Sequence, residues 1–175
     1  ARVEEPGQPA PPSNPCLRFP GLRTKPGRIL MQVSSAMARG KTLAALDALC
    51  HAVYSLLRYQ PGATGIYTTA EEAIAGGRGV CQDYAHIFIA LARLAGWHAR
   101  YCMGLTVGEG ATHAWAEIYY EGAWHGFDPT RDCRTDASYL RFATGRDAAD
   151  CPVEQGTFYG LADQTQTVFM RVKEI

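Results

Sequence analysis

Hydrophobic residues recur at helical spacing in two long stretches of the chain, and each stretch ends where helices commonly stop. The first stretch runs from Leu43 to Tyr59 and meets Pro61-Gly62, and the second runs from Cys81 to Ala95 and meets Gly96. The apolar positions are Leu46, Leu49, Cys50, Val53 and Leu57 in the first stretch and Tyr84, Ile87, Phe88, Leu91 and Leu94 in the second. This period predicts two helices, each with one buried face.

Shorter elements are predicted around these two helices. Thr69-Ala70-Glu71-Glu72 is a capping-box pattern, which predicts a short helix that ends at Gly76-Gly77. A further short helix is predicted near Ala137 to Phe142. One or two strands are predicted from Thr157 to Glu174, around Ala162-Asp163.

After Gly96 the hydrophobic period changes from helical to two, which indicates strands. Three antiparallel strands are predicted, over Arg100–Thr106, His113–Tyr120 and Ala123–Asp128. Gly108-Glu109-Gly110 and Glu121-Gly122 are the predicted turns between them. The last two strands are therefore expected to form a hairpin.

Length and charge limit the possible functions. At 175 residues the chain suits one domain with a real core, and its 17 basic and 17 acidic residues disfavour nucleic-acid or polybasic membrane binding. No apolar run approaches the roughly 20 residues of a membrane helix. Residues 1–27 hold seven of the ten prolines and are predicted as a tail or linker, with the core domain in residues 28–175. Because the chain opens at Ala1 without a signal-peptide pattern, we expect a processed or cut fragment.

The cysteines bear on metal binding and on the cellular compartment. The six are Cys16, Cys50, Cys81, Cys102, Cys133 and Cys151. None is spaced as C-x-x-C, so a common zinc site is not predicted. No cofactor is expected. An even number permits disulfides, but Cys50 and Cys102 fall in apolar patterns, where free thiols behave as small hydrophobes. A chain of this length does not need crosslinks, so a reducing, cytoplasmic compartment is favoured.

Cys81 stands at the predicted start of the second long helix. The thiolate is the nucleophilic form of cysteine, and the unpaired N–H groups and positive dipole end of a helix N-terminus favour it. Gly79 allows a tight turn before the helix, after which the Cys81 N–H can point at a developing oxyanion. A lone cysteine is more often buried and structural, as we interpret Cys50 and Cys102. The end-of-helix position favours a nucleophile at Cys81.

A histidine, His113, begins the strand before the predicted hairpin turn. With a turn at residues 121–123, two residues that face each other across the hairpin have residue numbers that add up to roughly 242–244. Asp128 then lies within a residue or two of facing His113. A carboxylate in that place holds one imidazole tautomer and stabilises the imidazolium. A lone histidine is more often structural, but this neighbour favours a catalytic role.

The remaining polar and aromatic residues are first given structural roles. Asp83 is near the third position of its helix, where a carboxylate commonly caps N–H groups. His86 and Gln82 either line the cleft or are solvated. Trp115 lies two residues past His113 on the same strand face, so it is a candidate for the cleft as well as for the core. The other aromatic residues expected in the core are Trp124, Phe127 and Tyr119, and the histidines expected at the surface or in packing are His98 and His125.

Taken together, these motifs resemble the transglutaminase-like superfamily of cysteine enzymes, in particular its bacterial cysteine protease branch. The matching segments are Thr68–Ala73, Gly77–His86, His113–Glu117, Gly126–Thr130, Thr144–Asp150 and Gly156–Phe158, within about residues 40 to 172. The resemblance implies an α+β, papain-like/transglutaminase-like core, in which the helix bearing the nucleophile packs on an antiparallel sheet. It also implies a Cys-His-Asp triad, carried here onto Cys81, His113 and Asp128.

The resemblance implies thiol acyl chemistry on amides, with loss of ammonia or an amine and transfer to water or another amine. The leading hypothesis is a cysteine-dependent hydrolase of peptide or isopeptide bonds. The alternatives are a transglutaminase-type transferase that joins a glutamine carboxamide to an amine, and a catalytically inactive peptide-binding module. The expected partner is a peptide or protein amide, and neither nucleic acid nor membrane.

Two parts of the family pattern differ in this chain. A papain-type oxyanion hole uses a glutamine six residues before the nucleophile, and here that position is Ala75. Gln82 and Tyr67 are the candidates for the second donor. Members of the branch usually carry an N-terminal β-rich domain, which we expect to be missing here, and the Pro-rich start resembles the linker that would follow it.

Overall fold

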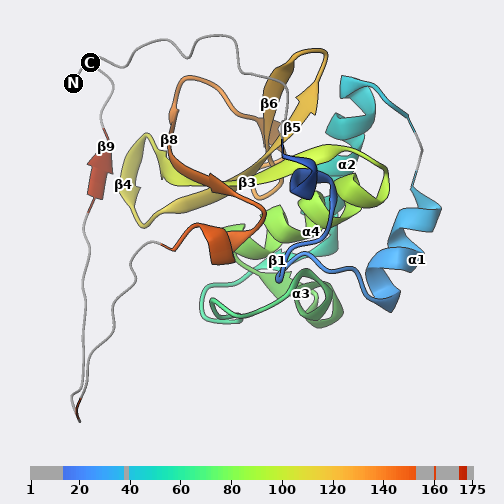
Figure 1. The fold of residues 1–175 in the computed structure, drawn as a ribbon. Coiled ribbons are helices and arrows are strands. Elements are labelled where there is room, and N and C mark those ends of the chain that lie inside the picture. The colour runs from blue at the N-terminus through green and yellow to red at the C-terminus, as the bar shows by residue number, and fades with distance from the viewer. Residues whose placement is uncertain (1–13, 38–39, 153–159, 161–169, 173–175) are drawn as a thin grey trace.

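Helices and strands form two layers in the computed structural model, which describes residues 14–37, 40–152, 160 and 170–172. The helices are α1 (Arg28–Ala36), α2 (Leu43–Leu56), α3 (Ala70–Gly76) and α4 (Cys81–Leu94), with 3₁₀ turns at Pro15–Arg18 and Ala148–Asp150. The strands are β1 (Arg58–Tyr59), β2 (Arg78–Gly79), β3 (His98–Thr106), β4 (Gly108–Gly110), β5 (His113–Tyr120), β6 (Ala123–Asp128), β7 (Cys133–Arg134), β8 (Tyr139–Gly145) and β9 (Met170–Val172). Helix α4 packs on β3 and β5, and the other three helices pack around α4 (Figure 1). The expected α+β fold is confirmed.

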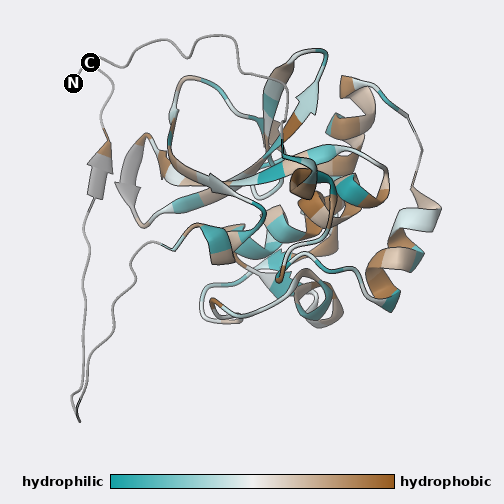
Figure 2. Cartoon of the chain, in the orientation of Figure 1, coloured by the Kyte–Doolittle hydropathy of each residue, from teal (hydrophilic) through white to brown (hydrophobic). Residues whose placement is uncertain are grey.

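Helix α4 lies at the centre of the core, because every residue from Asp83 to Arg93 is buried. The buried members of its predicted apolar face are Tyr84, Ile87, Phe88 and Leu91. Leu94, at the end of the helix, is 36% exposed. Phe88 stacks on Phe127 of β6 with ring centroids 5.5 Å apart, and Figure 2 shows hydrophobic residues concentrated on α1, α2 and α4. Burial of each large apolar side chain contributes about 1.5–3 kcal/mol, so this packing holds α4 against the sheet.

The main sheet has five antiparallel strands in the order β7-β6-β5-β3-β8. Strands β5 and β6 form the predicted hairpin, with Glu121 and Gly122 at positive φ in the turn. Ala116 pairs with Phe127, which confirms the predicted register. The start of β5 and the end of β6 therefore lie at the same end of the sheet.

Two predictions for the second half of the chain are wrong. Residues 139–145 form the edge strand β8, which pairs with β3, instead of a helix near Ala137 to Phe142. Backbone hydrogen bonds to β3 outweigh a weak local helix pattern there. Gly108–Gly110, predicted as a turn, forms β4 and pairs with β9. Strand β9 lies within the predicted strand region 157–174, most of which falls outside the described residues.

Helix α2 ends at Leu56, earlier than the predicted end at Tyr59. Arg58 and Tyr59 instead form β1, which pairs in parallel with β2. The Gln60 N–H extends this pairing by donating to the Gly79 carbonyl at 2.9 Å. The pairing places β1 beside the segment that leads into α4.

Helix caps that come from neighbouring residues in the sequence are predicted correctly. Helix α3 begins with the predicted capping box of Thr69 and Glu72 and ends at Gly77, whose φ is 63°. Gly96, with φ 79°, follows α4 as predicted. Helix α1 is not among the predicted elements, and its cap is distant in sequence: the Glu71 carboxylate accepts hydrogen bonds from the N–H groups of Gly27, Ile29 and Leu30.

Arg93 of α4 binds the N-terminal segment to the core. Its guanidinium donates to the Thr24 hydroxyl and to the carbonyls of Leu17, Ala99 and Arg146, at 2.8–3.1 Å. Thr24 is fully buried. Residues 14–27 lie in the predicted linker, yet they make specific contacts that a free linker would lack. The domain boundary after residue 27 stays a prediction.

We expect Arg93→Lys to lower the free energy of unfolding by about 3 kcal/mol, because lysine keeps the charge but loses most of the planar hydrogen bonds. Arg78 is exposed on β2 and provides the matched control. Arg78→Lys is expected to change the free energy of unfolding by less than about 0.5 kcal/mol. Urea denaturation of both variants measures the difference, and equal stabilities would contradict this role of Arg93.

Candidate active site

Cys81 is the first residue of α4 and is half-buried. Val80 before it is extended, and its N–H donates to Asp83 Oδ2 at 2.8 Å, so the predicted capping role of Asp83 is confirmed. The Thr64 hydroxyl donates to the same oxygen at 2.6 Å. Gly79 has no room for a side chain, since a Cβ there would lie 2.7 Å from the Asp83 side chain. These contacts fix where the helix begins and therefore where Cys81 lies.

The structure brings the three predicted residues Cys81, His113 and Asp128 together. His113 Nε2 lies 2.6 Å from Asp128 Oδ2. Because that nitrogen is engaged, Nδ1 is the ring atom left for the Cys81 thiol, which lies near enough to His113 to help raise its pKa. The His113 side chain is 12% exposed and that of Asp128 is fully buried. A thiol, an imidazole and a carboxylate thus adjoin in the order that a nucleophile, a base and an orienting group require.

The electrostatics of the pair favour an imidazolium beside a carboxylate. Burial alone would lower the pKa of His113, but hydrogen bonds to Asp128 and Cys81, together with their charges, raise it to about 9. Burial alone would raise the pKa of Asp128, but His113, the Tyr139 hydroxyl and the Thr130 N–H outweigh it, so this pKa is lowered. An imidazolium in this position stabilises negative charge on a neighbouring sulfur.

Three further residues bind Asp128, and none was expected from the sequence. The Tyr139 hydroxyl donates to Oδ2 at 2.8 Å, and the Thr130 N–H donates to Oδ1 at 2.9 Å. Arg131 Nε lies 3.8 Å from Oδ2. Tyr139 escapes sequence reasoning because its segment is assigned to a helix, whereas its β-favouring residues Tyr139, Phe142 and Thr144 are the signal for a strand.

Trp115 lies behind His113 rather than in an open cleft. It is 1% exposed, and its ring stacks on that of His113 with centroids 6.3 Å apart. The Trp115 ring also contacts the Tyr139 ring edge-on, with the two centroids 5.3 Å apart. Gly104 leaves space for this ring, because a Cβ there would lie 2.8 Å from it. Trp115 therefore holds the imidazole and offers no surface to a substrate.

The other candidate residues contact groups outside the triad. The Gln82 amide donates to the Gly65 carbonyl at 3.4 Å. Tyr67 is 72% exposed, with the Arg23 guanidinium 5.0 Å from its ring centroid. The expectation that His86 lines the cleft or is solvated is wrong, because His86 is fully buried and accepts a hydrogen bond from the Ala148 N–H.

The core aromatic residues fall into two groups. Phe127 is fully buried, as predicted. Tyr119 and Trp124 are half-buried and contact each other edge-on at 5.4 Å, with Arg100 over the Trp124 ring at 4.0 Å. His98 and His125 are also half-buried, in agreement with a packing role.

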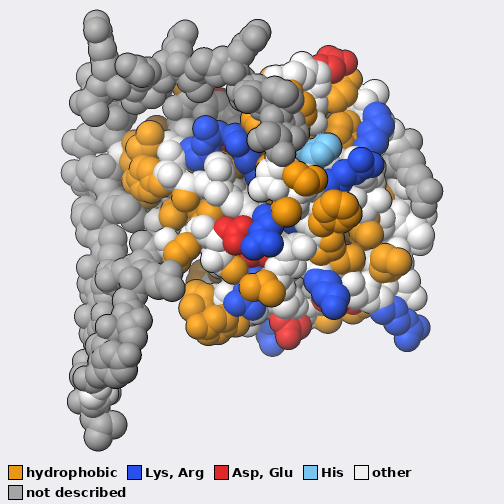
Figure 3. Space-filling model, in the orientation of Figure 1, with side chains coloured by type: hydrophobic (Ala, Val, Ile, Leu, Met, Phe, Trp, Pro, Cys, Tyr) orange, Lys and Arg blue, Asp and Glu red, His pale blue; other side chains and the backbone are white. Residues whose placement is uncertain are grey.

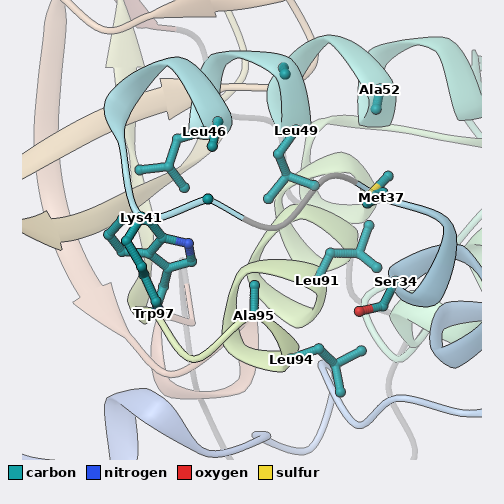
Figure 4. Close-up of a pocket in the computed structure, with 13 residues that line it drawn as sticks. Ser34, Met37, Lys41, Leu46, Leu49, Ala52, Leu91, Leu94, Ala95 and Trp97 are labelled. Carbon is teal, nitrogen blue, oxygen red and sulfur yellow. The ribbon is translucent and has the colours of Figure 1, made fainter.

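An apolar cavity of about 530 Å³ lies away from this site. It is formed between α2 and the end of α4, with Lys41 over the Trp97 ring on one side and Leu91 and Leu94 on another (Figure 4). Neither Cys81 nor His113 lines it. On the face shown in Figure 3, basic, acidic and hydrophobic side chains are interspersed.

Two limited findings on metal clusters and membrane-spanning helices come from the described residues. Within it, no three His, Cys, Asp or Glu side chains are arranged to hold a metal ion. None of the described helices combines the length and apolarity that crossing a bilayer requires. All six cysteines are free thiols.

Comparison with known proteins identifies the family. A family model described as the transglutaminase-like superfamily matches residues 32–129, which include Cys81, His113 and Asp128. The chain belongs to the transglutaminase-like superfamily. The expected membership is thus confirmed, and members of this superfamily are generally enzymes.

The relatives of this chain are longer than the region that they share with it. An uncharacterized protein of Mycobacterium leprae is 35% identical over 116 residues, which cover 61% of this chain and 41% of the relative. The crystal structure of a candidate cysteine protease from Cytophaga hutchinsonii superposes with a TM-score of 0.71 at 31% identity, covering 78% of this chain and 48% of that one. Legionella pneumophila LapG, with a TM-score of 0.53 at 16% identity over 69% of this chain and 71% of LapG, shares the fold. The chain thus spans less than half the length of the first two relatives.

We expect Gly79→Ala to lower the free energy of unfolding by at least about 1 kcal/mol, because the new Cβ would collide with Asp83. Gly76→Ala is the matched control, since a Cβ at Gly76 would meet nothing within 4 Å. That control is expected to be neutral or slightly stabilising, as alanine favours helix. Thermal denaturation of both variants gives the comparison. A Gly79→Ala protein as stable as the control would show that the start of α4 tolerates displacement.

Histidine titration tests the pairing with Asp128. By NMR, His113 should titrate at about pH 9 and His86 at about pH 3, where burial and then Arg23 and Arg93 lower its pKa. Asp128→Asn removes the carboxylate, so the pKa of His113 should fall while that of His86 stays the same. An unchanged His113 titration in that variant would contradict the pairing.

The same titration sets a pH dependence of stability. The pKa of His113 is about 9 in the folded chain against an ordinary value of 6.5. The stabilisation of the folded state by protonated His113 is therefore complete below pH 6.5 and is lost as the pH rises through about 9. The free energy of unfolding of the wild type should fall across this window, by up to about 3 kcal/mol. In Asp128→Asn the fall should be much smaller, as measured by urea denaturation at a series of pH values.

Proposed function

We propose that the protein is a cysteine-dependent amide hydrolase that acts on peptide or isopeptide bonds through Cys81, His113 and Asp128. The observation that carries the proposal is the 2.6 Å contact between His113 Nε2 and Asp128 Oδ2, which leaves Nδ1 for the thiol at the start of α4. The Cytophaga hutchinsonii neighbour, a candidate cysteine protease, supports hydrolysis as the first choice.

In the acylation step, Cys81 Sγ attacks the carbonyl carbon of the amide. A carbon–sulfur bond forms, and the carbonyl π electrons move to the oxygen, which becomes an oxyanion. The His113 imidazolium gives its Nδ1 proton to the amide nitrogen, the carbon–nitrogen bond breaks, and the carbonyl re-forms as a thioester. The free amine leaves, and His113 is neutral.

In the deacylation step, neutral His113 removes a proton from water as the water oxygen attacks the thioester carbonyl. The carbon–sulfur bond then breaks, so that the carboxylic acid leaves and the thiolate–imidazolium pair is restored. Asp128 holds the ring and stabilises its charge in both steps without taking a proton. The buried hydrogen bonds to Asp128 keep that carboxylate in place.

Water and a primary amine compete for the same thioester, so one experiment separates the two reactions. A peptide library is incubated with the protein, with and without a primary amine, and the products are measured by mass spectrometry. Fragments of cleaved peptides would support the hydrolase. Addition of the amine to glutamine side chains without cleavage would identify a transferase and overturn the proposal. An unchanged library would favour a peptide-binding module.

We expect Cys81→Ala to abolish turnover and leave the fold intact. His113→Ala should lower turnover about as much, because the effects of substitutions in residues that act as a unit are not additive. Asp128→Asn should cost less, since it keeps the shape of the side chain but not its charge. Cys16→Ala, at an exposed thiol in the N-terminal segment, is the matched control and should leave turnover unchanged. Activity retained in Cys81→Ala would exclude this nucleophile.

A further inference from the structure

The oxyanion of the proposed reaction needs donors beside Cys81. One donor is the Cys81 N–H, because the first N–H groups of a helix have no partner within it. Ala75 occupies the position of the papain-type glutamine and has no side-chain donor. The structure engages the Gln82 amide with the Gly65 carbonyl and leaves Tyr67 on the Arg23 side chain. Both of these candidates thus already have other partners.

Tyr59 lies against the start of α4. In the parallel pairing of β1 with β2, Tyr59 is opposite Gly79, which lies two residues before Cys81. Its ring centroid is 6.5 Å from that of Tyr84, a residue one helical turn beyond Cys81. The strand pairing with Gly79 and the ring contact with Tyr84 thus both hold the Tyr59 side chain along the first turn of α4.

The Tyr59 hydroxyl is free to bind a ligand. Tyr59 is 53% exposed, and within residues 14–37 and 40–152 no group accepts a hydrogen bond from its hydroxyl. Two other tyrosines near the site are engaged: the Tyr84 hydroxyl donates to the Leu57 carbonyl and the Tyr139 hydroxyl to Asp128. Tyr101 is only 3% exposed, so it offers far less surface to a ligand than Tyr59.

We propose that Tyr59 is the second oxyanion donor, a catalytic residue whose hydroxyl hydrogen-bonds the carbonyl oxygen of the substrate. The inference rests on the proposed function, since it assigns a role within that reaction. Tyr59 donates a hydrogen bond and transfers no proton, so the electron and proton balance of both steps is unchanged. The oxygen would lie between this hydroxyl and the Cys81 N–H.

The charges around Tyr59 agree with this role. Burial and then the nearby Cys81 raise the pKa of Tyr59, whereas Arg131 opposes the shift. The hydroxyl therefore keeps its proton at neutral pH and can donate it in a hydrogen bond.

Two small electrophiles separate oxyanion binding from thiol reactivity. With 4-nitrophenyl acetate, attack by Cys81 places negative charge on a carbonyl oxygen, and the burst of 4-nitrophenolate measures acylation. With iodoacetamide, the carbon–sulfur bond forms as the carbon–iodine bond breaks, the charge leaves on iodide, and no oxyanion develops. Cys81→Ala gives the background rate for both reagents.

We expect Tyr59→Phe to slow the 4-nitrophenolate burst by about 10²-fold, the usual effect of removing one oxyanion donor. Alkylation of Cys81 by iodoacetamide, followed by peptide mapping, should stay at the wild-type rate. Tyr54→Phe is the matched control at an exposed tyrosine and should change neither rate. Tyr67→Phe tests the rival candidate. The phenylalanine variant keeps the ring, so its far-UV circular dichroism should match the wild type.

Three outcomes would overturn the inference. A wild-type burst in Tyr59→Phe would exclude the donor, and a loss in Tyr67→Phe would assign the role to that residue. Equal losses with both reagents in Tyr59→Phe would show that Tyr59 acts through the thiol–imidazole pair. A wild-type Cys81 that reacts no faster with either reagent than the exposed Cys16 would instead contradict the proposed function itself.

Discussion

The antiparallel pairing of β5 with β6 is the constraint on which the candidate site depends. His113 begins one strand and Asp128 ends the other, so the short turn at Glu121 and Gly122 sets their separation. A slip of one residue would turn every side chain of a strand to the opposite face of the sheet. Phe127 would then leave the core, where it stacks on Phe88. The packing of this aromatic pair therefore fixes the register that brings imidazole and carboxylate into contact.

The fully buried Asp128 carboxylate is stable only because its oxygens are bound. A buried, isolated charge costs several kcal/mol, and here His113, Tyr139 and the Thr130 N–H supply hydrogen bonds. The benefit is reciprocal, because the carboxylate keeps the imidazole charged. Asp83 shows the contrast: burial raises the pKa of this carboxyl, and its Oδ1 has no partner among the described groups. Both carboxyls are buried near the site, and only the one paired with a histidine has a lowered pKa.

The local part of this arrangement could be predicted from the sequence, and the distant part could not. The limits of α4, the hairpin register and the capping box at Thr69 depend on residues a few positions apart, so the pattern is sufficient. The cap of α1 by Glu71 and the end of α2 at Leu56 depend on partners far along the chain. The strand that contains Tyr139 has β-favouring residues as a local signal, but its pairing with β3 is a long-range contact that the sequence does not reveal. Long-range backbone pairing thus decides the elements that local propensity leaves ambiguous.

The candidate site draws its groups from separate parts of the fold, so their arrangement depends on tertiary packing. Cys81 comes from the helix layer, His113 and Asp128 come from the sheet, and Tyr59 comes from the short β1 strand. None of these groups is held by its own segment alone. Their distances depend on how α4 rests on β3 and β5, and that packing is set by the apolar core beneath the helix. Because packed cores transmit small shifts, a change of core volume beneath α4 would move the thiol relative to the imidazole while leaving each group chemically intact.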